Sequence, residues 1–318
     1  MRLVDFAACR LILLTGKGGT GKTSVAAAMG RLGAQQGRRT LVVEVDSQRS
    51  ALAEAFGVTP GYEPMEIVPG LWGANLTFGP ALVDWLDETV RAAKIVKLIL
   101  ANQMVQVFLE ATPGAREIVV LSKIVALLDE FDQVIVDMPA SGHAINLLKV
   151  PTTAVRLMRS GPIHERAMQI LAELEAPSTA LGIIALPEEM VVNETVELYS
   201  KLHQLGSSIQ VPLVFLNRCA APTMTEDEHI LLHRLSNLNS DNADVEELLR
   251  AGRWDATLER ATADSLGRLH GEIGVGVVPF PRLGVLGGFD GGPEKVVTQM
   301  ASALRRRALA EARQDGGS

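Results

Sequence analysis

Nine residues near the start of the chain have the types and the spacing needed to hold phosphate. They run Gly16, Lys17, Gly18, Gly19, Thr20, Gly21, Lys22, Thr23 and Ser24. An apolar run precedes them and an amphipathic helical pattern follows, so backbone amides of the loop would surround a phosphate at the positive end of a helix. In such a loop Lys22 reaches the β- and γ-phosphates, and the Thr23 hydroxyl binds Mg²⁺. The segment therefore predicts a binding site for ATP and Mg²⁺.

Two further carboxylates follow apolar runs that read as strands. Asp46 ends the run at 40–46, and Asp137 lies near the end of the run at 133–138. Open α/β sheets bind ligands at the carboxyl ends of their strands, so both carboxylates are expected beside the phosphate loop. Asp46 is predicted to orient or deprotonate the attacking water, and Asp137 to hold Mg²⁺ through water. Either carboxylate alone could be a simple strand cap, but the two together favour catalysis.

Short apolar runs alternate with longer helical patterns along the chain, which is typical of a mostly parallel sheet with helices on both faces. Strands are expected at residues 10–15, 40–46, 133–138, 180–186, 212–217 and 275–280, with a weaker hairpin at 65–76. Helices are expected at 22–36, at 189–205 and from 293 onward. We predict one α/β P-loop domain over residues 1–318, with a doubly wound sheet. A helical subdomain at about 79–130 and a helical insertion at about 223–271 interrupt the alternation.

Composition restricts the kind of protein. Hydrophobic residues make up 47% of the 318 residues and the net charge is −7, which argues against a general nucleic-acid binder. The two cysteines, Cys9 and Cys219, form no C-x-x-C pair, which is usual in a reducing compartment. Apolar stretches are interrupted by lysines before they reach the length of a membrane span. We therefore expect a cytoplasmic protein, with no signal peptide and no nucleic-acid partner.

Lys17 adds a feature that a phosphate loop does not require. A lysine directly after the first glycine resembles the deviant Walker class, to which MinD and the nitrogenase iron protein belong. The resemblance implies that Lys17 crosses a dimer interface to the partner's nucleotide. A cation that arrives from the other subunit can stabilise charge on the transferring phosphoryl group, as an arginine finger does. The protein is accordingly expected to be a homodimer, with Lys17 and Lys22 as catalytic cations.

Four segments narrow the resemblance. Residues 137–148 look like the switch II segment of the arsenite-pump-driving and tail-anchored-protein-targeting ATPases, although the proline is displaced by one position. Residues 186–188, with Asn193, Glu194 and Thr195, resemble a segment of that family whose first glutamate contacts nucleotide. The run at 213–217 is similar to its adenine-reading strand, and 278–281 to the loop that closes over adenine. The resemblance implies that Glu188, Asn217, Pro279 and Phe280 bind nucleotide.

The sequence also departs from that family. The first switch reads Asp46, Ser47, Gln48, Arg49, Ser50, without the proline and histidine of the family pattern. The clustered thiolates that bind metalloid and the C-x-x-C zinc clamp are both missing, so no zinc is expected. The duplicated two-domain form is missing as well, so a second nucleotide site requires a second chain.

The output of an ATP-driven switch is left open by these residues. A targeting or chaperone-like factor for hydrophobic segments, the motor of an anion or metalloid pump, and a MinD- or ParA-like positioning ATPase all remain possible. Residues 92–109 are apolar on more than one helical face, so they either line a client groove or pack as core. Ile95, Ile99, Met104 and Phe108 would face such a groove. The partner is therefore expected to be a protein client or a membrane-associated protein.

Overall fold

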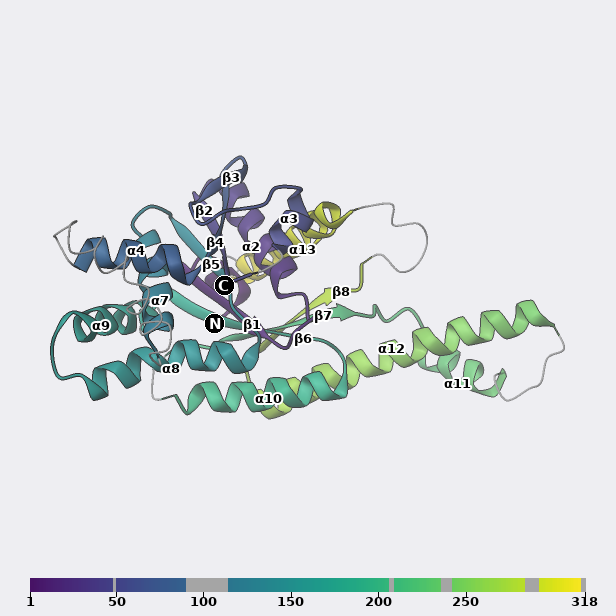
Figure 1. Cartoon of the computed structure of the whole chain (residues 1–318). Coiled ribbons are helices and arrows are strands. Elements are labelled where there is room, and N and C mark those ends of the chain that lie inside the picture. Colours follow the sequence, from purple (N-terminus) through teal and green to yellow (C-terminus); the bar gives the residue numbers. More distant parts are fainter. Residues whose placement is uncertain (48–49, 90–113, 206–208, 236–241, 284–291, 316–318) are drawn as a thin grey trace.

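The computed structural model describes residues 1–47, 50–89, 114–205, 209–235, 242–283 and 292–315. Its centre is one sheet with the order β3-β4-β2-β5-β1-β6-β7-β8 (Figure 1). The strands are β1 (Leu11–Gly16), β2 (Thr40–Val45), β3 (Met65–Val68), β4 (Leu71–Leu76), β5 (Gln133–Asp137), β6 (Thr179–Ala185), β7 (Leu213–Cys219) and β8 (Gly276–Pro281). Only the pairing of β3 with β4 is antiparallel, and the other six pairings are parallel. The predicted α/β class is confirmed.

The expected strands coincide with observed ones to within two residues at each end. The reason is visible in β1, whose side chains alternate between the two faces of the sheet. Leu11 and Leu13 belong to one buried cluster, whereas Ile12 and Leu14 belong to the other. A strand buried on both faces must be apolar throughout, and that continuous apolar run made it recognisable.

Helices cover both faces of the sheet (Figure 1). One face carries α1 (Leu3–Ala7), α2 (Lys22–Gln35), α3 (Ala51–Phe56) and α13 (Pro293–Asp315). The other carries α7 (Ala115–Leu127), α8 (Ser141–Leu157), α9 (Pro162–Leu174), α10 (Glu189–His203) and the second half of α12 (Ala243–Ile273). The helix expected from residue 293 onward runs from Pro293 to Asp315.

The two predicted helical additions are partly described. In the first, α4 (Phe78–Thr89) packs on α7. Residues 90–113, which include Ile95, Ile99, Met104 and Phe108, lie outside the described part of the chain. The second contains α11 (Glu226–Leu235) and the 31-residue α12. None of the helices in the described ranges is long and apolar enough to cross a membrane.

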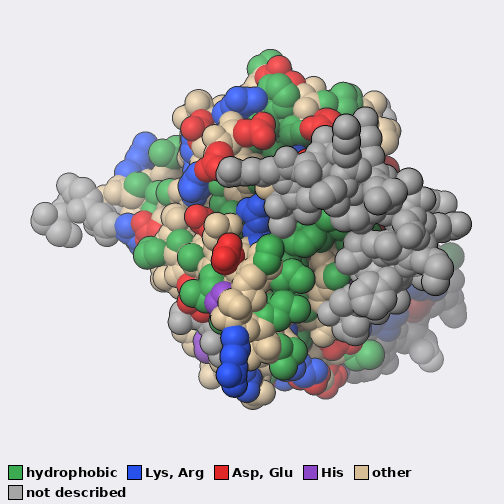
Figure 2. Space-filling model, turned by 60° about the vertical axis from the view of Figure 1, so that its left-hand side comes forward, with side chains coloured by type: hydrophobic (Ala, Val, Ile, Leu, Met, Phe, Trp, Pro, Cys, Tyr) green, Lys and Arg blue, Asp and Glu red, His purple; other side chains and the backbone are tan. Residues whose placement is uncertain are grey.

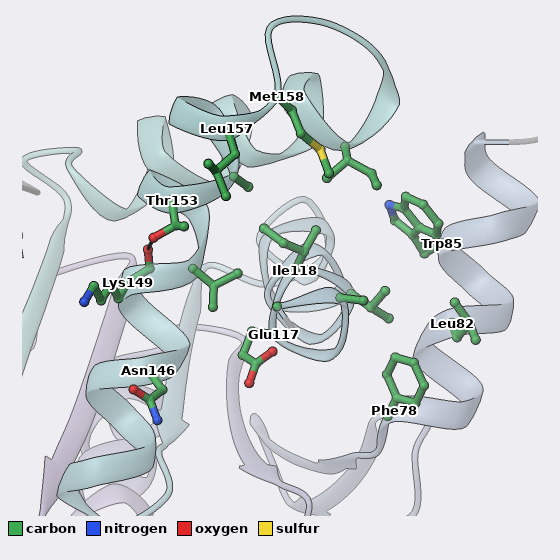
Figure 3. A pocket seen from close by; sticks show the side chains of 16 residues that line it. Phe78, Leu82, Trp85, Glu117, Ile118, Asn146, Lys149, Thr153, Leu157 and Met158 are labelled. Carbon is green, nitrogen blue, oxygen red and sulfur yellow. Dashed lines mark hydrogen bonds between the residues drawn. The ribbon is translucent and has the colours of Figure 1, made fainter. Parts of the chain in front are cut away.

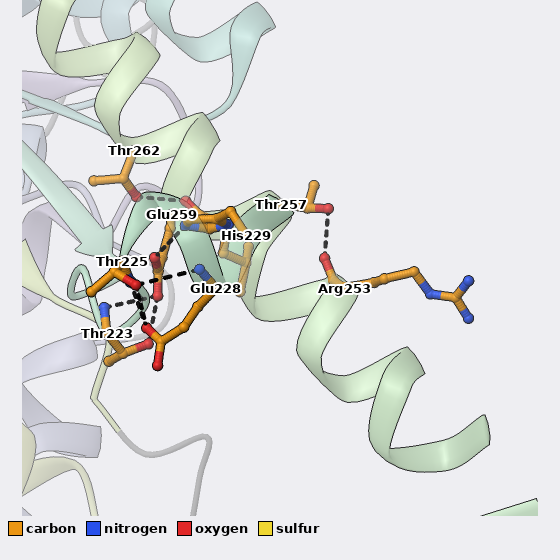
Figure 4. Close-up of polar contacts among 9 residues, drawn as sticks. Thr223, Thr225, Glu228, His229, Arg253, Thr257, Glu259 and Thr262 are labelled. Atoms are coloured by element: carbon orange, nitrogen blue, oxygen red, sulfur yellow. Dashed lines mark hydrogen bonds and ion pairs between the residues drawn. The ribbon is translucent and has the colours of Figure 1, made fainter. Parts of the chain in front are cut away.

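The first half of α12 projects from the body of the molecule, with α11 beside it (Figure 1). Every buried residue of α12 lies at or after Glu259, and α11 has none. Glu259 accepts hydrogen bonds from the backbone N–H and the hydroxyl of Thr223, at 2.9 and 2.5 Å, and contacts Nε2 of His229 at 3.2 Å (Figure 4). We call α11 and the first half of α12 the arm. These contacts hold the chain that follows β7 against the base of the arm, where α12 meets the body of the molecule.

Candidate nucleotide site

The phosphate loop connects β1 to α2 and requires glycine at two described positions. Gly16 has φ +148°, and a Cβ there would lie 2.2 Å from the carbonyl oxygen of Ile184. Gly21 caps α2 with φ +90°, and a Cβ there would lie 2.4 Å from Nδ2 of Asn217. Both positions combine a backbone conformation that side chains avoid with no room for one. The loop geometry that the sequence implied therefore depends on these glycines.

Contacts within the loop already engage its polar side chains. The buried Thr20 hydroxyl donates to the carbonyl oxygen of Lys17 at 2.9 Å, and Nζ of Lys22 donates to the same oxygen at 3.2 Å. Burial lowers the pKa of Lys22, while the charge of Asp137 opposes that shift. Gly18 and Gly19 are exposed, and Ser24 is half-buried in the first turn of α2. The loop thus presents exposed backbone beside a lysine held inside it.

Asp137 at the end of β5 contacts Thr23 of α2, the helix that follows the neighbouring strand β1. β1 pairs with β5, and the Thr23 hydroxyl donates a hydrogen bond to Oδ2 of Asp137. The other oxygen of Asp137 is buried and has no hydrogen-bond partner among the described residues. Burial raises the pKa of Asp137 to about 6, with Glu44 adding to the rise, whereas Thr23 and Lys22 oppose it. A buried carboxylate oxygen that needs a positive partner, next to a hydroxyl, fits the oxygen ligands that Mg²⁺ prefers.

Asp46 lies at the same edge of the sheet, because β2 is the other neighbour of β5. Its backbone has φ +54°, and its N–H donates to the carbonyl oxygen of Leu76 at 2.9 Å. Its half-exposed carboxylate forms an ion pair with Arg116 of α7. Both line a cavity of about 460 Å³ with Pro139 and His143, which follow Asp137. The fold thus brings the two predicted carboxylates and the second switch segment together.

Lys17 has a partner that the sequence did not predict. Its Nζ lies 2.6 Å from Oε1 of Glu194 on α10, and the two side chains are 34% and 40% exposed. Glu194 belongs to one of the segments that carried the family resemblance, but nothing in its spacing indicates this contact. In the single chain, the lysine expected to act in trans is therefore neutralised by a carboxylate of its own chain.

The four residues assigned to the nucleoside differ in their exposure and contacts. Nδ2 of the buried Asn217 donates to the carbonyl oxygen of Thr20 at 2.8 Å, so this side chain supports the loop. Glu188 is exposed just before α10, and Pro279 is exposed on β8. The side chain of Phe280 is 1% exposed and stacks on Phe215 with centroids 5.9 Å apart. The side chain of Phe280 is therefore part of the core and is not exposed to a ligand, and the nucleoside contacts stay predictions.

A second, apolar cavity of about 410 Å³ lies between α4, α7, α8 and the start of α9 (Figure 3). Hydrophobic side chains gather on this side of the molecule (Figure 2). The lining residues are Phe78, Leu82, Trp85, Gly114, Ala115, Glu117, Ile118, Val119, Asn146, Lys149, Val150, Thr153, Ala154, Leu157, Met158 and Ile163. The groove predicted at 92–109 lies outside the described residues and stays a prediction. The sequence did not indicate the cavity described here, because residues 141–148 of α8 read as part of the switch II segment.

Comparison with known proteins finds ATPases that are similar to this chain. The chain is 28% identical over 274 residues to the ATPase BagA of Mycobacterium tuberculosis, a match that covers 82% of this chain and 78% of that protein. It is 27% identical over 220 residues to an arsenical pump-driving ATPase of Acidiphilium multivorum, covering 61% of this chain and 37% of that protein. For the arsenical pump-driving ATPase of Escherichia coli the identity is 30% over 174 residues, covering 52% and 29%.

The sequence model of the anion-transporting ATPase family matches residues 9–175. This range contains the phosphate loop, Asp46, Asp137 and the second switch segment, and it confirms the resemblance to the arsenite-pump-driving ATPases. Because the match spans more than half of the 318 residues, the chain belongs to the anion-transporting ATPase family.

Proposed function

We propose that this protein is an ATP-hydrolysing switch that works as a homodimer and couples its nucleotide state to the binding of an apolar partner segment. The observation that carries the proposal is the course of α8. This helix begins four residues after Asp137, and its second half lines the apolar cavity with Val150, Ala154 and Leu157. At about 1.5 Å per residue, its 17 residues span about 26 Å. One helix thus runs from the segment that follows Asp137 to the apolar cavity.

In this proposal the phosphate loop binds ATP through its backbone amides and Lys22. Thr23 and Asp137 would hold Mg²⁺, which, when bound, neutralises charge on the phosphates. Asp46 orients the attacking water. Its position just after β2, at the same edge of the sheet as the phosphate loop, supports that role. Glu188, Asn217, Pro279 and the backbone of Phe280 are assigned to the nucleoside by resemblance.

Lys17 acts on the nucleotide of the partner subunit in this proposal, so hydrolysis requires the dimer. The half-exposed pair with Glu194 supports it, because ion pairs between such side chains contribute little stability and exchange readily. Binding of the partner would exchange the carboxylate of Glu194 for phosphate oxygens.

The apolar cavity supports a hydrophobic partner segment over a purely polar one. Its volume is within the range of ligand pockets, and its walls are mostly aliphatic and aromatic. Leu157 and Met158, which both line it, are 78% and 41% exposed. Soluble proteins rarely leave such side chains together without a binding role.

Binding to the cavity is tested with a matched pair of variants. We expect Leu157→Asp to weaken binding of a lysine-flanked leucine–alanine peptide of about 20 residues by roughly tenfold, the effect of losing about one buried apolar side chain. Leu248→Asp on α12 is the control, because Leu248 is 72% exposed and far along the chain from the cavity. Fluorescence anisotropy of labelled peptide measures both. Equal affinities for the two variants would favour a positioning role with polar partners.

A pump motor is the second candidate, favoured by the names of two relatives, which are called arsenical pump-driving ATPases. The positions of the two cysteines do not suit metalloid binding. Both are buried, Cys219 in one core cluster and Cys9 in the cluster on the other face of the sheet. Burial also raises the pKa of Cys219 to about 11, so its thiol stays protonated at neutral pH and is a poor soft-metal ligand.

We therefore expect that arsenite leaves the ATPase rate unchanged. The rate is measured by phosphate release with and without arsenite, and a Cys9→Ser, Cys219→Ser double variant is the control. Stimulation of several-fold in the native protein that disappears in the double variant would establish the pump motor instead.

A further inference from the structure

The first turn of α7 forms a wall between the two cavities. Gly114 and Ala115 line the apolar cavity, and Arg116 lines the cavity at the nucleotide site. Glu117 lines both, and so does Asn146 of α8, which faces this turn (Figure 3). A displacement of this turn on one side must therefore change the shape of the other side.

Arg116 contacts groups that belong to both cavities. Its guanidinium pairs with the carboxylate of Asp46 at the nucleotide side. The same guanidinium lies over the ring of Phe78, 5.9 Å from its centroid, and Phe78 is a wall of the apolar cavity. A single side chain thus connects the predicted water-orienting carboxylate to the apolar site.

The pair restricts what Asp46 can do. A carboxylate that is hydrogen-bonded to a guanidinium is held toward it, so the carboxylate of Asp46 is directed toward α7. The backbone of Asp46 is fixed by its hydrogen bond to Leu76, so freeing the carboxylate means moving the side chain or moving Arg116. The side chains of Arg116 and Asp46 are 51% and 46% exposed, so their ion pair adds little stability and can be broken readily.

We propose that Arg116 is a positioning residue that holds Asp46 out of the reaction while the apolar cavity is empty and releases it when an apolar segment enters. Entry of a segment against Phe78 and Ile118 shifts the first turn of α7 and weakens the pair. Occupancy of the cavity thereby accelerates hydrolysis. This inference rests on the proposed function, which assigns Asp46 to hydrolysis and an apolar ligand to the cavity.

The test compares steady-state ATPase kinetics of three variants. Arg116→Gln is expected to raise kcat in the absence of peptide by roughly two- to fivefold, the factor that corresponds to a half-exposed ion pair. Its KM for ATP stays unchanged, and the leucine–alanine peptide gives no further stimulation. Arg116→Lys keeps the charge and is expected to retain both a low basal rate and stimulation by the peptide.

Arg307→Gln is the matched control. Arg307 forms an ion pair with Glu311 within α13, and neither residue lines either cavity, so its loss should leave kcat and the stimulation unchanged. Thermal melts of all variants confirm that they fold. A folded Arg116→Gln protein whose basal kcat equals or falls below that of the native protein overturns the inference.

The Asp46→Asn variant separates the role of Asp46 in hydrolysis from the role of Arg116. An Asp46→Asn protein that hydrolyses ATP at the native rate refutes the proposed role of Asp46. If Asp46→Asn is inactive and Arg116→Gln is unchanged, the proposed function stands and only the role of Arg116 fails. If the Asp46→Asn, Arg116→Gln double variant is as inactive as Asp46→Asn, the acceleration operates through Asp46, as proposed.

Discussion

The two lysines of the phosphate loop lie five residues apart but have different hydrogen-bond partners. Lys22 is drawn into the loop and donates to a backbone oxygen, whereas Lys17 points outward and pairs with Glu194. An inward cation is suited to nucleotide held by its own chain. An outward cation on a weak ion pair is suited to a phosphate that arrives on another chain.

Removing the carboxylate partner of Lys17 should therefore strengthen the dimer. Each dimer breaks two such pairs, together worth about 1 to 2 kcal/mol, so Glu194→Gln is expected to lower the dimer Kd roughly 5- to 30-fold. Analytical ultracentrifugation with a non-hydrolysable ATP analogue measures this. Glu197→Gln on the same helix, where Glu197 pairs with Lys201, is the control and should leave the Kd unchanged. A weaker dimer in the Glu194→Gln variant would mean that Glu194 orients Lys17 rather than restraining it.

Residue identities predicted the loop, Asp46 and Asp137, because phosphate and Mg²⁺ demand particular groups at particular strand ends. The partners of those residues could not be predicted. Lys17 and Glu194 are 177 residues apart, and Arg116 is 70 residues from Asp46. Such contacts depend on how helices are placed on the sheet, which periodicity in the sequence does not encode.

Among the elements, α8 and α12 show what the sequence leaves undetermined. Most of α12 lies in the helical insertion expected at about 223–271, whereas α8 was not among the helices named from the sequence. Only the structure reveals that α8 lines two cavities and that half of α12 projects from the body (Figure 1). α8 also continues through the buried Pro151, a residue that usually ends a helix. Tertiary packing against α7 and α9 outweighs the missing hydrogen bond there.

The base of the arm should confer a pH-dependent contribution to stability. Burial alone would raise the pKa of Glu259, but hydrogen bonds from Thr223 and the contact with His229 hold that pKa below its ordinary value of 4.5 (Figure 4). A carboxyl group with a depressed pKa stabilises the fold above its unfolded pKa, and the contribution is lost as the pH falls through its folded pKa.

Glu259→Gln should consequently lower the free energy of unfolding by about 1 to 2 kcal/mol at neutral pH, and the deficit should shrink toward about pH 4. Chemical denaturation at both pH values measures it. Glu272→Gln on the same helix is the control, because Glu272 is half-exposed and pairs with Arg268 at 2.9 Å. A deficit that is the same at both pH values would show that geometry, not charge, matters at this site.

For the whole molecule, the main expectation is association controlled by nucleotide. In the proposed site, Lys17 of one copy acts on the nucleotide of a second copy. We expect a monomer without nucleotide and a dimer with a non-hydrolysable ATP analogue, at tens of micromolar protein, on the order of ordinary weak-dimer affinities. Multi-angle light scattering gives the mass directly. A Lys17→Ala variant should stay monomeric, and a dimer that forms equally well with that variant would contradict a role of Lys17 in trans.

The projecting half of α12 affects how the protein diffuses. A compact chain of 318 residues has a radius of gyration of about 20 Å, whereas α12 alone, at 31 residues, is about 46 Å long. Much of that length, with α11 beside it, stands clear of the sheet and its helices (Figure 1). The frictional ratio of the monomer should exceed that of a sphere of equal mass. On a gel-filtration column calibrated with globular standards, the monomer should therefore elute early, with an apparent mass above its true mass.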